Sequence, residues 1–226
     1  MKTLAIIPAY NEEGSVVATV DELVSLVPSI DYVVVNDGST DRTLDLCRGR
    51  GLNVINLPVN LGLTAGFQAG MKYALEHGYD CAVQFDADGQ HRPEYIQGMV
   101  DEMIRTNADV VIGSRFVDGK KRASARMAGS TLISAMMKLT TGAKIVDPTS
   151  GMRLYNRSMI EKFAKGHDLG PEPDTIAYFI RKGATVVEVP VSMRERVTGE
   201  SYLSFSKSIS YMLRTCVSIL FVQWFR

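Results

Sequence analysis

The chain has 226 residues, of which 25 are Lys or Arg and 25 are Asp or Glu, so its formal net charge at pH 7 is zero. This length allows a domain with a substantial core, and the balanced charge gives no argument for nucleic-acid binding. Cys47, Cys81 and Cys216 are far apart and lack the spacing of metal ligands, which predicts free thiols in a reducing compartment. The apolar run at residues 4–7 is too short for the core of a signal peptide, so we expect a cytosolic protein.

The first half of the chain alternates predicted strands and helices. Strands are expected over residues 3–8, 32–36, 52–57, 79–83 and 109–113, and helices over residues 12–27, 63–77 and 93–106. A further short helix around Leu44 is expected to be capped by Ser39 or Thr40. The strands are apolar without polar alternation, which is typical of a parallel sheet covered on both faces. We therefore predict an α/β fold with a doubly wound, mostly parallel sheet.

Polar residues gather where four of these strands end, at residues 9–12, 36–37, 60–62 and 86–90. In doubly wound sheets, ligands bind beyond the carboxyl ends of the strands. The turn after the first strand has no glycine before Gly14, unlike the glycine-rich turn of a dinucleotide fold. The glycine- and lysine-containing run of a P-loop does not occur either. Both common classes of nucleotide site are therefore excluded.

Two carboxylates, Asp86 and Asp88, follow the fourth strand at the point where Gly89 bends the chain. Side chains at positions i and i+2 of an extended segment point the same way, so the two carboxylates can face one object. They repel each other unless a positive group lies between them, and a divalent cation with oxygen ligands is the usual group. Gln90 would add a neutral carbonyl oxygen. The alternative is a pair of solvated turn aspartates that cap the next helix.

The second half of the chain changes in character. Five basic residues lie within a dozen positions, which indicates either a solvated face or an anion-binding segment: Arg115, Lys120, Lys121, Arg122 and Arg126. An apolar helix is expected at residues 132–139, and a turn at residues 147–152 leads into a strand. Residues 170–174 open a helix that runs to Lys182, because proline and carboxylates suit a first helical turn. A last strand is expected at residues 185–191.

Residues 206–226 repeat apolar side chains at helical spacing, which predicts a broad amphipathic helix. Arg214 interrupts it, and the uncharged run at residues 215–225 is only about half of the ~20 residues that span a membrane. Three interpretations are open: packing on the domain, contact with a second subunit, or a position in the membrane interface with Trp224 and Phe225 as anchors. We therefore divide the chain into a domain at residues 1–205 and an extension at residues 206–226.

Six short stretches, in order along the chain, carry a combined pattern: residues 7–12 (IPAYNE), 36–41 (NDGSTD), 60–62 (NLG), 86–91 (DADGQH), 113–115 (GSR) and 147–155 (DPTSGMRLY). Together they resemble the family-2 glycosyltransferases of GT-A fold. The nearest branch is that of dolichol-phosphate mannose synthase and related bacterial polyprenyl-phosphate enzymes. The resemblance continues through residues 196–201. The chain differs from that branch at Ala125, Ser134 and Met152, and these differences leave the acceptor open.

The resemblance implies an inverting, metal-dependent enzyme that moves a sugar from a nucleoside diphosphate to a lipid-linked acceptor, preferably a polyprenyl phosphate. The residues expected to bind the nucleotide sugar are Pro8, Ala9, Tyr10, Glu12, Asp37, Gly62, Asp86, Ala87 and Asp88. Asp86, Asp88 and Gln90 would hold Mg²⁺ or Mn²⁺, and we expect the loss of Asp88 to be more damaging than the loss of any base. The residues expected to bind the acceptor are Arg115, Arg126, Ser130, Arg153 and Arg196.

The identity of a catalytic base depends on the acceptor. A phosphate is already an anion, whereas a sugar hydroxyl of a lipid-linked or growing polysaccharide requires a base. Glu172 or Asp174 is the expected base in that alternative, and Asp147 is a further candidate. We expect the protein at the cytosolic face of a membrane, with a peripheral lipid contact or a homodimer as candidate partners.

Two other classes of function are weaker alternatives. A sugar nucleotidyltransferase would combine a similar sheet with paired aspartates, but it usually carries a basic, glycine-rich loop after the first strand. Residues 9–14 contain no Lys or Arg. A binding or scaffold protein on an inactive transferase fold would be expected to have a broken metal motif, and here the motif is intact.

Overall fold

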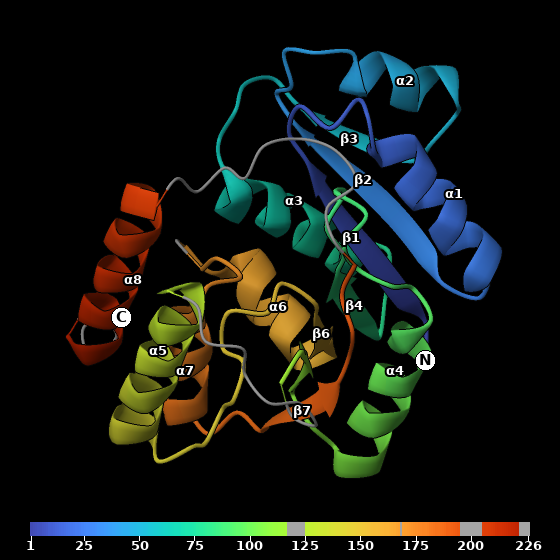
Figure 1. The fold of residues 1–226 in the computed structure, drawn as a ribbon. Helices are drawn as coiled ribbons and strands as arrows, with labels where there is room; N and C mark the ends of the chain where they lie inside the picture. Colours follow the sequence, from blue (N-terminus) through green and yellow to red (C-terminus); the bar gives the residue numbers. More distant parts are fainter. Residues whose placement is uncertain (117–124, 168, 195–204, 222–226) are drawn as a thin grey trace.

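The computed structural model describes residues 1–116, 125–167, 169–194 and 205–221 (Figure 1). Within this part of the chain, seven strands form one sheet in the order β3-β2-β1-β4-β6-β5-β7. Their bounds are β1 Thr3–Ala9, β2 Asp31–Asp37, β3 Val54–Leu57, β4 Cys81–Gln84, β5 Val110–Ser114, β6 Arg153–Asn156 and β7 Val186–Pro190. Strand β6 is antiparallel to β4 and β5, and the other neighbours pair in parallel. The doubly wound, mostly parallel sheet is therefore confirmed.

Helices cover both faces of this sheet (Figure 1). One face is packed by α1 (Val16–Leu26), α2 (Thr43–Gly49) and α4 (Tyr95–Thr106), whose buried side chains form one apolar core. The core on the other face includes side chains of α3 (Leu63–Glu76), α5 (Ala125–Thr141), α6 (Arg157–Lys165), α7 (Pro173–Arg181) and α8 (Phe205–Leu220). Of these helices, α3 and α6 lie against the strands. The two cores explain why the inner strands are apolar on both faces.

Close packing of α3 on the sheet depends on a helical glycine. A Cβ atom at Gly70 would lie 2.3 Å from Cγ2 of Ile6, so a side chain there would push α3 away from β1. Next to it, the ring of Phe67 makes edge contacts with Tyr155 and Phe163 at centroid distances of 5.5 and 5.1 Å. These contacts fix the height of α3 and α6 over the strands, and with it the turn that precedes α3.

The C-terminal helix packs against α5 and α7. Gly129 of α5 makes room for Met212 of α8, and Cys216 and Ile219 are buried in the apolar core. Packing on the domain is thus observed for the described part of α8. Trp224 and Phe225 lie outside the described residues, and the division of the chain at residue 206 stays a prediction. No helix in the described ranges is long and apolar enough to cross a bilayer.

Two local predictions at the ends of helices were wrong. Helix α1 begins at Val16 instead of residue 12, because the left-handed backbone of Asn11 (φ 55°) leads into a turn in which Glu12 O accepts from Ser15 N. Helix α2 is not capped by Ser39 or Thr40. Asp41 Oδ1 accepts from the backbone N–H of Thr43 at 2.9 Å instead.

Candidate active site

The turns that follow β1, β2, β3 and β4 meet at the carboxyl edge of the sheet. From β1 the chain continues through α1 to β2 on one side, whereas β4 joins β1 on the other side after α3. Such a reversal of strand order opens a crevice between neighbouring turns, which is where ligands bind in this class of sheet. Most of the predicted site residues lie in or next to these four turns.

The turn after β1 is locked to the turn after β2. Asn11 N donates to Ser39 Oγ at 3.0 Å, and Asn11 Oδ1 accepts from Thr40 N at 2.8 Å. Glu12 N donates to Thr43 Oγ1 at 2.8 Å. Burial raises the pKa of Asp41, but hydrogen bonds from Thr43 and from the backbone outweigh it and hold that pKa below its usual range. Pro8, Ala9, Tyr10 and Glu12 therefore sit on a rigid double turn.

Asp37 holds the third turn. Its two carboxylate oxygens accept from the backbone N–H groups of Leu61 and Gly62, each at 2.8 Å. The next residue, Gly38, has a φ of 62°, and a Cβ atom there would lie 2.3 Å from the carbonyl carbon of Val59. The structure therefore shows Asp37 ordering the loop that carries Gly62, and its predicted contact with the nucleotide stays a prediction.

Asp86 is braced from two sides. Gln84 Nε2 donates to its Oδ1 at 3.2 Å, and His91 Nε2 lies 3.5 Å from its Oδ2. Because His91 Nδ1 accepts from the Asp86 backbone N–H at 2.9 Å, the proton of a neutral His91 ring is assigned to Nε2, facing the carboxylate. Gly151 passes so close that a Cβ atom there would lie 2.8 Å from Asp86 Oδ2. The Asp86 side chain is still 37% exposed, so it can meet a ligand.

The turn from Asp88 to Gln90 completes this cluster. Asp88 is buried, and its Oδ1 accepts from Gln90 N at 3.0 Å. The hydroxyl of Thr19 in α1 donates to Ala87 O at 3.0 Å, so α1 also holds this turn in place. Gln90 Nε2 donates to the Arg194 carbonyl at 3.4 Å, so the amide oxygen is the atom that Gln90 has to offer a ligand.

The described residues hold no group of three or more His, Cys, Asp or Glu side chains arranged around a common metal position. Two carboxylates and an amide oxygen are nonetheless the hard ligands that Mg²⁺ and Mn²⁺ prefer. A cation held by so few protein atoms takes its other ligands from water or from substrate phosphates. The residues present thus fit a cation that is bound together with a diphosphate.

Arg115 and Asp147, predicted for different roles, form an ion pair with each other. Arg115 Nε and Nη2 donate to the two oxygens of Asp147, each at 2.7 Å. Asp147 is fully buried. Arg115 Nη2 also donates to Thr149 Oγ1, which in turn donates to Ser130 Oγ at 3.3 Å. The predicted acceptor residues Arg115 and Ser130 therefore share one network, in which Asp147 orients the guanidinium.

Arg153 is buried at the start of β6, opposite Gln84 in the sheet. Its guanidinium donates to the carbonyls of Pro171 and Pro148, each at 2.6 Å. In this arrangement Arg153 ties together the loops before β6 and α7 instead of facing solvent. Arg196 lies outside the described residues, as does the side chain of Arg126, so their acceptor contacts stay predictions.

The two remaining carboxylates are bound to the C-terminal helix. Glu172 accepts from Tyr211 Oη at 2.6 Å, and Asp174 accepts from Ser218 Oγ at 2.5 Å. Sequence reasoning did not identify Tyr211, Ser218 or Thr149. The hydroxyls of these residues bind partners that are far away along the chain, and such contacts leave no pattern in the local sequence. The sequence indicated a role for His91 only weakly, through its position at the end of the DADGQH stretch.

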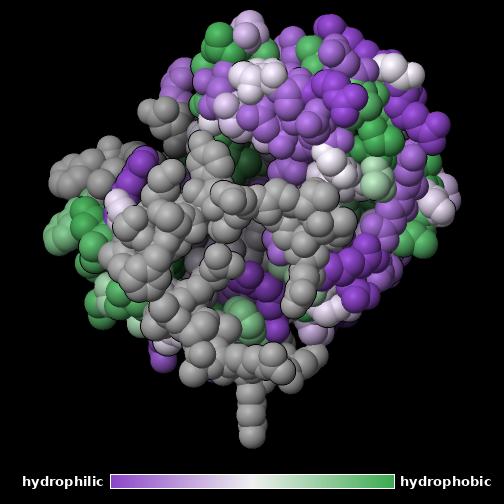
Figure 2. All heavy atoms as spheres, turned by 45° about the horizontal axis from the view of Figure 1, so that its top comes forward, coloured by the Kyte–Doolittle hydropathy of each residue, from purple (hydrophilic) through white to green (hydrophobic). Residues whose placement is uncertain are grey.

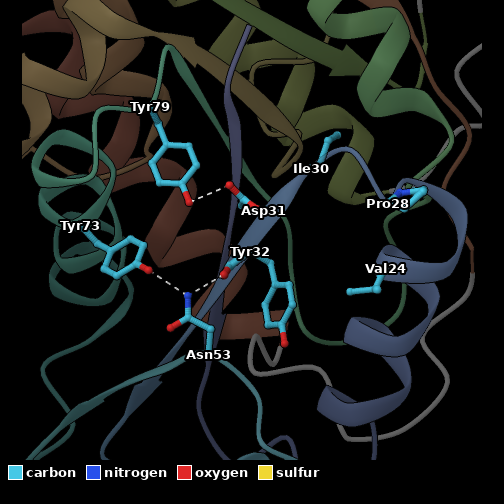
Figure 3. Close-up of a pocket in the computed structure, with 8 residues that line it drawn as sticks. All are labelled: Val24, Pro28, Ile30, Asp31, Tyr32, Asn53, Tyr73 and Tyr79. Atoms are coloured by element: carbon cyan, nitrogen blue, oxygen red, sulfur yellow. Dashed lines mark hydrogen bonds between the residues drawn. The ribbon is translucent and has the colours of Figure 1, made fainter.

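A separate hollow of about 400 Å³ lies at the opposite edge of the sheet (Figure 3). Several of its polar groups are paired with one another: Tyr79 Oη donates to Asp31 at 3.0 Å, and Asn53 Nδ2 donates to the Tyr32 carbonyl and the Tyr73 hydroxyl. Burial and the neighbouring Asp31 raise the pKa of the Tyr79 phenol. This hollow lies at the amino ends of the strands, away from the turns that carry most of the predicted site residues.

Comparisons with known proteins agree on one family. Residues 4–164 match the family model described as glycosyl transferase family 2. An undecaprenyl-phosphate mannosyltransferase of Micrococcus luteus is 36% identical over 218 residues, which are 90% of this chain and 88% of that protein. A polyprenol monophosphomannose synthase of Mycolicibacterium smegmatis is 33% identical over 220 residues, with coverages of 91% and 82%.

Solved structures share the fold at lower sequence identity. A glucosyl-3-phosphoglycerate synthase of Mycobacterium tuberculosis with bound phosphoglyceric acid has a TM-score of 0.72 and 16% identity, covering 97% of this chain and 79% of that one. The same enzyme in complex with Mn²⁺, uridine diphosphate and phosphoglyceric acid has a TM-score of 0.67 and 18% identity, with coverages of 95% and 78%. At these identities the likeness is one of fold alone.

Proposed function

The chain belongs to glycosyl transferase family 2, and from this membership we propose that it transfers a sugar from a nucleoside diphosphate to a polyprenyl phosphate, with inversion at the anomeric carbon. Two relatives that match at 36% and 33% over most of their length are named for sugar transfer to, or synthesis on, such lipids. The observation that carries the proposal is the braced, partly exposed Asp86 carboxylate next to buried Asp88 at the sheet edge.

In this proposal, Asp86, Asp88 and Gln90 hold Mg²⁺ or Mn²⁺. A bound cation acts as a Lewis acid on the diphosphate, whose negative charge grows as the sugar leaves. Gln84 and His91 both contact the Asp86 carboxylate and orient it, which is the usual task of residues behind a metal ligand. The complex of the tuberculosis enzyme with Mn²⁺ and uridine diphosphate supports this assignment by analogy of fold.

The nucleotide is assigned to the double turn at Pro8, Ala9, Tyr10 and Glu12. The hydrogen bonds between this turn and residues 39–43 fix its shape before any ligand arrives, which lowers the entropic cost of binding. Asp37 contributes through the loop at Gly62, whose backbone it orders. Ala87 lies buried beneath the diphosphate position in this assignment.

A phosphate acceptor is consistent with the finding that all three candidate bases are already engaged in contacts within the protein. Asp147 is fully buried and holds Arg115, and Glu172 and Asp174 each accept a hydrogen bond from α8. A phosphate oxygen needs no base: it attacks the anomeric carbon opposite the diphosphate, and the nucleoside diphosphate leaves with the electrons of the broken C–O bond. Arg115, which Asp147 keeps in one orientation, is assigned to the incoming phosphate together with Arg126 and Arg196.

The lipid acceptor implies contact with a membrane, and we assign this contact to the outer faces of α5 and α8, at the cytosolic surface. Large apolar side chains are exposed there: Leu132, Leu139, Leu213, Val217 and Phe221. Figure 2 shows hydrophobic side chains gathered at the left edge of the molecule, where Figure 1 places these helices. An exposed apolar face on an amphipathic helix suits a position at a lipid surface. A homodimer through the same face stays a prediction.

The test is nucleotide release from a panel of sugar nucleotides with Mn²⁺ or Mg²⁺, with and without a short polyprenyl phosphate. A mannose nucleotide comes first because both relatives are named for mannose. We expect release that the lipid phosphate stimulates and a chelator abolishes. Metal-dependent release that ignores the lipid phosphate would instead indicate a hydroxyl acceptor.

A further inference from the structure

We infer that the C-terminal helix is part of the transfer site, and that Tyr211 is a positioning residue that acts through Glu172. The inference rests on the proposed function in that it assumes sugar transfer at the carboxyl edge of the sheet. It assigns to Tyr211 and Glu172 a role in holding the turn at residues 170–174, and not a role in proton transfer.

The contact between Tyr211 and Glu172 is short and protected. Tyr211 Oη donates to Glu172 Oε2 at 2.6 Å, within the range of a strong hydrogen bond to a carboxylate. Burial, followed by the negative charge of Glu172 and the hydrogen bond to it, raises the pKa of the Tyr211 phenol. Tyr211 therefore stays protonated and keeps its donor at physiological pH.

A second contact from the same helix repeats this arrangement. Ser218 lies seven residues after Tyr211, on the same side of α8, and donates to Asp174 Oδ2 at 2.5 Å. Asp174 is itself buried in the first turn of α7. Two hydroxyls of α8 thus hold two carboxylates that lie two residues apart, so the turn cannot shift without breaking contacts to α8.

On its other side the same turn contacts the site. The Pro171 carbonyl accepts from Arg153, whose guanidinium also binds the Pro148 carbonyl next to Asp147. Gly170 packs so closely on Thr64, in the first turn of α3, that a Cβ atom would lie 2.4 Å from Thr64 Oγ1. The turn at residues 170–174 therefore contacts α8 on one side and, on the other side, the loops that carry the proposed nucleotide and acceptor residues.

The outer side of α8 explains why such a link matters. Leu213, Val217 and Phe221 are exposed at i, i+4 and i+8, whereas Tyr211 and Ser218 point inward. The helix that presents apolar side chains to a lipid surface is thus the helix that fixes the turn. Through α8, the surface that would contact the acceptor lipid is connected with the turn at residues 170–174 that borders the site.

The experiment is a double-mutant cycle on sugar transfer with Tyr211→Phe and Glu172→Ala. We expect each single change to lower kcat/KM for the polyprenyl phosphate about tenfold, because each removes the same charge-assisted hydrogen bond. The double variant should lose no more than either single variant. KM for the sugar nucleotide should stay within about twofold of the wild-type value, a split that general destabilisation would not produce.

Two further variants separate positioning from chemistry. Glu172→Gln keeps an acceptor for Tyr211 and should retain most of the activity, whereas a catalytic base would lose nearly all of it. Tyr79→Phe is the matched control, because it removes a phenol–carboxylate hydrogen bond to Asp31 at the opposite edge of the sheet (Figure 3). It should leave transfer unchanged within about twofold. Ser218→Ala, acting through Asp174, should show a smaller loss of the same kind.

Three results would overturn the inference: multiplicative losses of about a hundredfold in the double variant, a Tyr211→Phe variant as active as Tyr79→Phe, or an inactive Glu172→Gln variant. Failure of the proposed function is a different result, because wild-type protein would then transfer sugar to no polyprenyl phosphate. If the acceptor is a saccharide hydroxyl, the same cycle is measured with that acceptor, and loss of Glu172→Gln activity there counts against the positioning role.

Discussion

The bracing of Asp86 by His91 leads to the sharpest prediction. His91 is 2% exposed and touches Asp86 twice, through the backbone N–H at 2.9 Å and the carboxylate at 3.5 Å. His91→Ala leaves the partly buried backbone N–H of Asp86 without its acceptor, which costs about 1–3 kcal/mol. It also removes the edge contact with Phe85, at a centroid distance of 5.5 Å, which contributes about 0.5–1.5 kcal/mol. We expect a loss of about 1.5–4.5 kcal/mol in the free energy of unfolding.

The same change should weaken the proposed metal site at Asp86 and Asp88. Removing a residue that orients a metal ligand typically lowers affinity by about 10–100-fold. His91→Asn is the informative second variant, since its amide oxygen can replace Nδ1 at the backbone N–H but cannot reach the carboxylate. We therefore expect His91→Asn to recover most of the stability while its metal affinity stays about tenfold below that of the wild type.

The assays are urea unfolding and the Mn²⁺ concentration that half-activates nucleotide release. His77→Ala is the control, because His77 is an exposed histidine at the end of α3, far from the sheet edge that carries Asp86. The reasoning is refuted if His91→Ala needs no more Mn²⁺ than the wild type. It is also refuted if His91→Asn unfolds as easily as His91→Ala.

Four other predictions follow from single contacts. Gly151→Ala should raise the Mn²⁺ requirement about tenfold, because its Cβ would press on Asp86 Oδ2, whereas Gly98→Ala, where a Cβ meets nothing within 4 Å, should leave it unchanged. Asp37→Asn should lower stability by about 1–2 kcal/mol in urea unfolding and raise KM for the nucleotide, since an amide offers one oxygen to two N–H groups. Arg115→Ala should cost about 3–5 kcal/mol, because it leaves the buried Asp147 carboxylate unpaired; a loss below about 1 kcal/mol would contradict this. Burial raises the pKa values of the three cysteine thiols above their ordinary 9.0, and that of the Tyr211 phenol above its ordinary 10.0. As the pH rises, these groups therefore lose their protons in the unfolded chain before they do so in the folded protein. Stability measured by urea unfolding should then fall as the pH rises above about 9.

Much of the fold could be predicted because its signals are local. Apolar runs of the right length gave the strands, and the polar residues after them gave the carboxyl edge. The family expected from six short stretches is confirmed by the match over residues 4–164. The antiparallel insertion of β6 between β4 and β5 was not predictable, because no local signal says which strand a segment will pair with.

The site was predicted less completely, for a physical reason. The sequence identified candidate site residues by the type of their side chains. The structure shows which of these side chains bind one another or other parts of the protein. Arg115 was predicted for the acceptor and Asp147 as a candidate base, and the structure shows that they bind each other. Glu172 and Asp174 are likewise held by hydroxyls 39 and 44 residues away. Such pairings depend on tertiary packing, which spacing along the chain does not encode.

The most direct test of the account is to recover the product itself. Purified protein, Mn²⁺, a radiolabelled mannose nucleotide and a short polyprenyl phosphate are incubated together, and label in the organic phase is compared between the wild type and Asp88→Asn. We predict a lipid-extractable sugar phosphate of inverted anomeric configuration from the wild type, and a loss of at least about a hundredfold with Asp88→Asn. Label that stays in the aqueous phase for every sugar nucleotide, or equal activity of Asp88→Asn with and without metal, would contradict the account.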